Sequence, residues 1–199
     1  MTVTLKVLIR IQLAALLVAA CTPVLDQVGI DNALYPALGV PGIRAHEIFI
    51  ATTRQGSSDE AVFFSGQRSQ TLGLASVTVT VPPSHDPGKL ERPKRLPPDP
   101  TRDFTIVQPE VYEQDQDFVQ AIDRALARRA PQDRDVMLFV HGYNTTMSVA
   151  ALRITQFVED GGFKGVPVLF SWASAGRTTR YVYDLNSALA ARHTSNRPR

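Results

Sequence analysis

The spacing of apolar and polar residues changes character near the middle of the chain. In the first half, short stretches alternate apolar and polar side chains with a period of two, most clearly Val77, Val79 and Val81 with threonines between them. This period is typical of half-buried β-strands. We therefore expect strands in three ranges, which are 47–52, 75–81 and 104–107.

The second half alternates helical and strand patterns. Apolar residues at helical spacing predict helices over 117–129, over a stretch ending near 160, and over 180–192. Uninterrupted apolar runs predict strands buried on both faces over 136–140 and 166–172. Strands that alternate with helices predict a parallel sheet with right-handed crossovers. The fold class is therefore α/β, with mixed N-terminal strands followed by a parallel βαβα unit, and functional residues are expected beyond the carboxyl ends of the strands.

The first residues have the pattern of a secretion signal. Lys6 and Arg10 precede an uncharged apolar run, and the run ends in small residues before Cys21. The run is too short to span a membrane, which takes about 20 residues. Val18-Ala19-Ala20-Cys21 also resembles the lipobox of bacterial lipoproteins, in which the cysteine receives the lipid.

This resemblance implies a signal peptide over 1–20, a lipid on Cys21 and a tether over 21–45. The protein would then be a membrane-anchored lipoprotein of the bacterial cell envelope, facing the periplasm or the exterior. The alternatives are an ordinary signal peptide that contains a cysteine and an uncleaved anchor.

Composition and charge limit the remaining classes. The 199 residues, 44% hydrophobic and 20% charged, suit one domain over 46–199, with a proline-rich excursion over 82–103. The net charge of +2 comes from Lys6 and Arg10, because the other cationic and acidic side chains balance. A neutral body provides no field that attracts nucleic acid, so we expect no nucleic-acid partner.

The sequence His141-Gly142-Tyr143-Asn144 directly follows the apolar run 136–140. A strand end followed by a helix start leaves backbone N–H groups unpaired and pointing the same way. Such groups can hold an anion, including the oxyanion of an acyl-transfer intermediate, and glycine allows a tight turn and a close approach of the backbone. An ordinary turn is the alternative interpretation.

The stretch VMLFVHGYN, followed by FSWASAG and YVYD, resembles a bacterial α/β-hydrolase family of unknown function with esterase-like members. The resemblance extends over about residues 46–191 and departs from the family at Ala173, where proline is usual. It implies a small ester substrate. It also implies an oxyanion-hole loop formed by Gly142, Tyr143 and Asn144, with the backbone N–H of Tyr143 or Asn144 as the donor.

The same resemblance implies roles for residues around this loop. His141 would be structural, tying the loop to a strand, and would not be the general base. Trp172 and Ser174 would line the site. On the following helix, Tyr181, Tyr183 and Asp184 would pack or form hydrogen bonds.

The catalytic residues of a serine hydrolase are absent from the sequence. No serine lies in a G-x-S-x-G elbow, and at Ser174, the nearest case, Trp172 occupies the place of the first glycine. His193 precedes the place of a nucleophile, so it is out of order for the base. We therefore expect the N-terminal part of an α/β-hydrolase sheet, truncated before the nucleophile elbow and inactive as this chain.

The other chemistries have less support. Four histidines and one cysteine show no metal-ligand spacing, and no phosphate-binding glycine loop occurs, so we expect neither a metal nor a cofactor. The alternative function is a non-enzymatic membrane-anchored lipoprotein or interaction fragment. In that case the strand over 166–171 would form an exposed apolar sheet edge.

Overall fold

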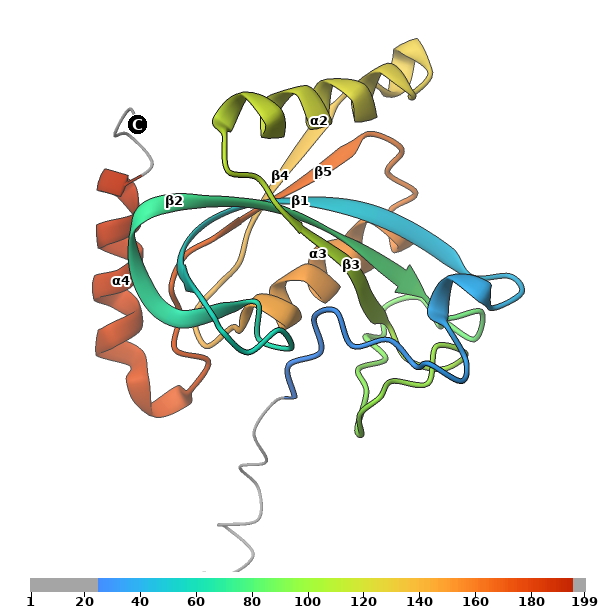
Figure 1. Ribbon diagram of the computed structural model, residues 1–199, viewed down its shortest axis with the longest axis horizontal. Helices are drawn as coiled ribbons and strands as arrows, with labels where there is room; N and C mark the ends of the chain where they lie inside the picture. Colours follow the sequence, from blue (N-terminus) through green and yellow to red (C-terminus); the bar gives the residue numbers. More distant parts are fainter. Residues whose placement is uncertain (1–24, 195–199) are drawn as a thin grey trace, which may run out of the picture.

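The computed structural model describes residues 25–194, which form a five-stranded mixed sheet (Figure 1). The first three strands pair antiparallel in sequence order, and the last two run parallel to the first. The strand order is β3-β2-β1-β5-β4. The strands are β1 (Arg44–Gly56), β2 (Phe64–Val81), β3 (Thr105–Val111), β4 (Val136–Val140) and β5 (Val166–Ser171).

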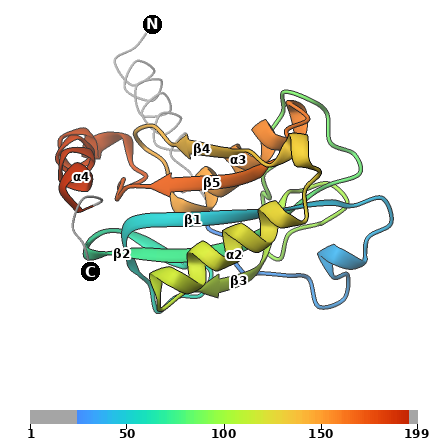
Figure 2. The ribbon, with the colours of Figure 1, turned by 90° about the horizontal axis from the view of Figure 1, so that it is seen from above.

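Helices cover both faces of this sheet. Figure 2 shows α2 (Asp115–Ala127) on one face and α3 (Met147–Asp160) on the other. The last helix, α4 (Tyr181–Thr194), stands beside the sheet near the bend of β2 (Figure 1). Three short 3-10 helices complete the described part of the chain: η1 (Ala37–Gly39), η2 (Pro131–Asp133) and η3 (Thr178–Arg180). The predicted α/β class, with mixed strands followed by parallel ones, is confirmed.

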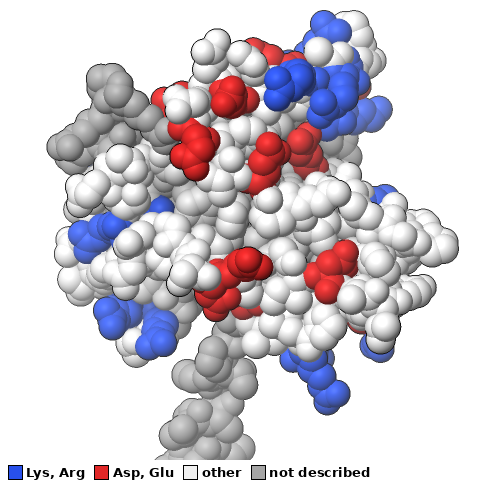
Figure 3. Space-filling model, viewed as in Figure 1, with Lys and Arg blue, Asp and Glu red and all other residues white. Residues whose placement is uncertain are grey.

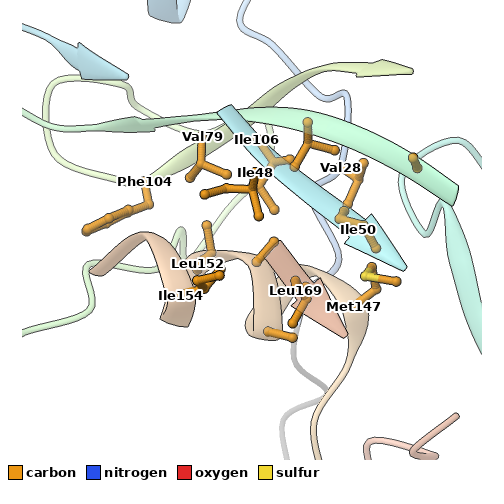
Figure 4. Packing of buried hydrophobic residues seen from close by; sticks show 14 of the residues in the cluster. Val28, Ile48, Ile50, Val79, Phe104, Ile106, Met147, Leu152, Ile154 and Leu169 are labelled. Atoms are coloured by element: carbon orange, nitrogen blue, oxygen red, sulfur yellow. The ribbon is translucent and has the colours of Figure 1, made fainter. Parts of the chain in front are cut away.

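The larger part of the core lies between the sheet and α3. Figure 4 shows Ile48, Ile50 and Val79 of the sheet facing Leu152 and Ile154 of α3. All five side chains are at most 1% exposed. Burying one such side chain contributes about 1.5–3 kcal/mol, so this interface fixes the position of α3 and of the loop that precedes it.

The sheet edge differs from the expectation. β5 pairs with β1 on one side and with β4 on the other, so the strand over 166–171 is internal and β4 is the edge. The prediction that β4 is buried on both faces is also wrong. Val136, Leu138 and Val140 are 51%, 64% and 53% exposed, while the alternate residues Met137 and Phe139 pack against the core.

Part of the segment before β1 packs against the domain, so the stretch around residues 26–28 of the predicted tether over 21–45 is not free chain. Val28 is 1% exposed and forms a parallel bridge with Ile106, and Asp26 accepts a hydrogen bond from Ser148 of α3. The predicted signal peptide over 1–20 and Cys21 lie outside the described residues. Among residues 25–194, no helix has the length and apolar character needed to cross a bilayer.

The proline-rich excursion after β2 is attached to the far end of α3 by a histidine. His85, whose side chain is 2% exposed, places Nδ1 2.7 Å from Oε2 of Glu91 and Nε2 2.8 Å from Oδ1 of Asp160. Its ring also packs edge-on against Phe104 at 5.2 Å. The excursion therefore lies against the domain, where it covers the end of α3.

Candidate functional site

Two loops meet at one end of the parallel strands. His141–Asn144 follows β4, and Trp172–Gly176 follows β5. Because β4 and β5 are parallel neighbours, their carboxyl ends lie at the same edge of the sheet. Asp184 of α4 reaches the same place. The structure thus brings together residues that the sequence pointed to on three separate segments.

His141 links the first loop to β5. Its ring is buried, with Nδ1 2.7 Å from the Gly142 carbonyl oxygen and Nε2 2.9 Å from Ser171 Oγ. A carbonyl oxygen can only accept, so Nδ1 carries the hydrogen and Nε2 accepts from Ser171. Burial, together with the nearby Arg54 cation, lowers the pKa of His141 to about 4, so the ring is neutral at neutral pH. Trp172 stacks on the ring at 5.0 Å and donates Nε1–H to the His141 carbonyl.

The Ser171–His141 hydrogen bond has the form of a nucleophile with its base. Ser171 is 0% exposed, however, and Arg54 Nε donates to the same Oγ at 2.8 Å. A substrate carbonyl cannot reach a hydroxyl that is enclosed in this way. The pair therefore connects β5 to the loop after β4.

Arg54 of β1 lies at the centre of the cluster, although no role was predicted for it. Its side chain is 1% exposed. Burial lowers the pKa of Arg54 to about 10, an effect that Asp184 and Asp26 partly oppose, so the guanidinium stays charged at neutral pH. The guanidinium donates to the carbonyls of Thr145 (2.7 Å), Ser174 (2.9 Å) and Ser65 (3.3 Å), in addition to Ser171 Oγ.

Asp184 holds both loops from the side of α4. The carboxylate is 1% exposed, and its Oδ2 accepts from the Asn144 N–H at 3.0 Å and from Ser174 Oγ at 2.5 Å. Its Oδ1 accepts from the Ala175 N–H at 2.7 Å. Ser174 Oγ in turn accepts from the Thr145 N–H at 3.0 Å. Ser174 is therefore buried and engaged as part of this connection.

The backbone of the His141–Asn144 loop contains both occupied and free donors. Asn144, with φ 56°, has the left-handed backbone conformation in this loop, and Gly142 does not. Its N–H is directed to Asp184, so in this structure it does not face an incoming anion. Within the described part of the chain, the N–H groups of Gly142 and Tyr143 have no hydrogen-bond partner. A Cβ on Gly142 would meet nothing within 4 Å, so the space beside this backbone is open.

Two tyrosines of α4 have different surroundings. Tyr181 is 58% exposed and packs edge-on against Tyr143 at 5.4 Å, at the rim of the site. Tyr183 donates its hydroxyl to the Gly66 carbonyl, and Arg68 lies over its ring at 4.7 Å. Tyr183 therefore attaches α4 to β2, while Tyr181 remains accessible. Among residues 25–194, no group of three or more His, Cys, Asp or Glu side chains is arranged to hold a metal ion.

Comparison with known proteins gives one family. Residues 116–196 match the family described as "Alpha/beta hydrolase of unknown function (DUF900)". No curated protein and no solved structure matches the chain. The matched segment covers less than half of the chain but includes the His141–Asn144 loop, Trp172–Gly176 and Asp184. The mixed sheet with alternating helices is an α/β-hydrolase-like fold, and residues 116–196 are similar to an α/β-hydrolase family of unknown function.

Proposed function

We propose that the chain provides the oxyanion-binding side of an esterase-type hydrolase site that acts on a small ester. The observation that carries this proposal is the pair of backbone N–H groups, Gly142 and Tyr143, without a partner in the described chain at the carboxyl end of β4. The similarity of residues 116–196 to an α/β-hydrolase family supports it.

The surroundings of the loop suit this role. When an ester carbonyl is attacked, negative charge develops on its oxygen, and donors held rigidly at 2.7–3.1 Å stabilise that charge. Ser171 of β5 holds His141, Asp184 of α4 holds Asn144, and Arg54 of β1 holds the next residue, so the donors of the loop need little reorganisation. The loop also leads into the N-terminus of α3, whose dipole favours negative charge.

We further propose that residues 1–199 alone do not turn over esters. No serine of this sequence lies in a G-x-S-x-G elbow, and the two serines of the cluster, Ser171 and Ser174, are buried and hydrogen-bonded. Treatment with a fluorophosphonate probe should therefore label no serine, as measured by mass spectrometry of the intact chain. A stoichiometric label on any serine would overturn this part of the proposal.

The oxyanion loop itself is tested by titrating the 15N-labelled chain with methylphosphonate, a tetrahedral anion. We expect the amide signals of Gly142 and Tyr143 to shift, while Asn144, already bound to Asp184, moves less. Gly56, the exposed last residue of β1, is the internal control. If Gly142 and Tyr143 move no more than Gly56, the loop does not bind tetrahedral anions.

A second candidate function is that of a non-enzymatic interaction module anchored to a membrane. The exposed apolar residues of the β4 edge favour it. The anchor would be a lipid on Cys21, which places the chain at the bacterial cell envelope, facing the periplasm or the exterior. Treatment with globomycin, or the variant Cys21→Ala, should block processing and change the electrophoretic mobility or the membrane fractionation of the protein. Unchanged mobility together with unchanged fractionation in both experiments would contradict the lipoprotein proposal.

A further inference from the structure

A hollow of about 430 Å³ lies at the opposite end of the parallel strands from the His141–Asn144 loop. It opens between the amino ends of β1 and β5 and the turn that follows α2. The charged and titratable side chains that line it are His46, Glu47, Arg128, Arg129, Asp133 and Lys164. Its volume falls in the range of about 300–1,000 Å³ that is usual for small-ligand sites.

The charges around this hollow do not cancel. Arg128 is paired with Glu47 at 3.0 Å. The remaining charged side chains of the lining are two cations, Arg129 and Lys164, and one carboxylate, Asp133. No ion pair joins either cation to another described residue. Figure 3 shows Lys and Arg side chains gathered where α2 ends, a segment that carries four arginines (Arg124, Arg128, Arg129 and Arg134).

Basic residues at the end of a helix have an ordinary explanation, because they offset the partial negative charge of its last carbonyls. That explanation does not account for the Arg129 guanidinium. Its Nε is buried and has no hydrogen-bond partner within the described chain. A buried donor left unpaired costs about 1–3 kcal/mol. A turn of the Arg129 guanidinium that brings this donor to a ligand oxygen in the hollow would remove that cost.

We propose that this hollow binds a small phosphate monoester through its phosphate group. Arg129 offers the forked donors that match phosphate oxygens, and Lys164 adds a second cation from the turn before β5. The volume exceeds that of a phosphate alone, so there is room for a small hydroxylated group. The Asp133 carboxylate on the lining could accept hydrogen bonds from such hydroxyls.

The probes are inorganic phosphate and glycerol 3-phosphate, each titrated into the 15N-labelled chain. We expect saturable shifts of the Lys164 and Gly165 amides, with tighter binding of the monoester. Arg129→Met and Lys164→Met should each weaken binding at least about tenfold, or about 1.4 kcal/mol. Arg124→Met is the matched control, since Arg124 lies one turn earlier on α2, does not line the hollow, and should leave binding unchanged.

Three results would overturn the proposal: shifts that do not saturate, equal weakening by Arg124→Met, or unchanged binding in both test variants. Equal weakening of binding by Arg124→Met would mean that general electrostatic attraction, and not a specific binding site, causes the shifts. Lys164 is exposed, so Lys164→Met keeps the test valid even if Arg129→Met fails to fold. Shifts at Gly142 and Tyr143 are scored separately, so the outcome is independent of the proposed oxyanion loop.

Discussion

Replacement of Arg54 by methionine tests whether a buried guanidinium holds the candidate site together. Methionine keeps the apolar stem but removes the donors that reach Thr145, Ser174, Ser65 and Ser171. Each buried acceptor left unsatisfied costs about 1–3 kcal/mol. The gain from no longer burying a charge offsets part of this sum, while Asp184 loses a nearby cation. We therefore expect a net loss of about 3–5 kcal/mol, as when a buried charge pair is broken.

The chain carries its own reporter for this loss. Trp172 is the only tryptophan, and it stacks on His141 inside the cluster, so its fluorescence follows the site during urea unfolding. In thermal unfolding, the expected loss corresponds to a Tm lower by roughly 6–20 °C, at about 2–4 °C per kcal/mol for a domain of this size. Arg54→Lys retains the charge but not the fork, and we expect it to recover only part of the stability.

Arg68→Met is the matched control. Arg68 is exposed on β2 and lies over the Tyr183 ring, so its loss should cost only about 0.5–1 kcal/mol. If Arg54→Met costs no more than Arg68→Met, and the Trp172 spectrum is unchanged, the guanidinium does not hold the loops.

Three further predictions concern stability. Both ring nitrogens of His85 face carboxylates, those of Glu91 and Asp160. Burial lowers the pKa of His85, but the hydrogen bonds to these carboxylates outweigh burial and raise the pKa above 6.5. The protonated ring therefore stabilises the folded state fully below the pKa of the unfolded chain, and this contribution is lost as pH rises through the pKa of the folded state. Urea unfolding at about pH 6 and pH 8.5 should show this loss, and His85→Gln should abolish it. Leu152→Ala, at a site 1% exposed, should lower the free energy of unfolding by about 2–5 kcal/mol. Leu138→Thr, on the exposed β4 edge, should change it by less than about 0.5 kcal/mol and should slow aggregation at high concentration, measured by light scattering.

The elements could be predicted where their pattern is local. β4 and β5 were predicted to within one residue, because an apolar run between turns is a property of the segment itself. The first part of β2 was missed. Its sequence from Phe64 to Leu74 is mostly polar and has no alternation. It is a strand because it pairs with β1, as in the register Arg54 to Arg68 and Gly56 to Phe64. Such pairing between segments is not visible within either one.

The edge strand was predicted wrongly for a related reason. VMLFV in β4 and VPVLF in β5 are equally apolar, so neither run tells which strand lies inside the sheet. The chain order suggests that the later strand is the outer one. In the structure, the crossover through α3 instead returns β5 to a position between β4 and β1. Strand order is decided by contacts between distant segments, and here it leaves Leu138 rather than a β5 residue exposed.

The candidate site could also be predicted only in part from the sequence. His141 and Asp184 lie in recognisable motifs, and the structure brings them to the two connected loops. Arg54 could be noticed only as a cation that two threonines separate from the apolar stretch IFIA, where a charged side chain would ordinarily turn to solvent. Three of its partners are main-chain carbonyls, of Thr145, Ser174 and Ser65, which any residue type could supply. Since no side-chain pattern encodes those partners, a single sequence does not reveal that Arg54 is buried, and only the meeting of β1 with the two loops makes it the centre of the site.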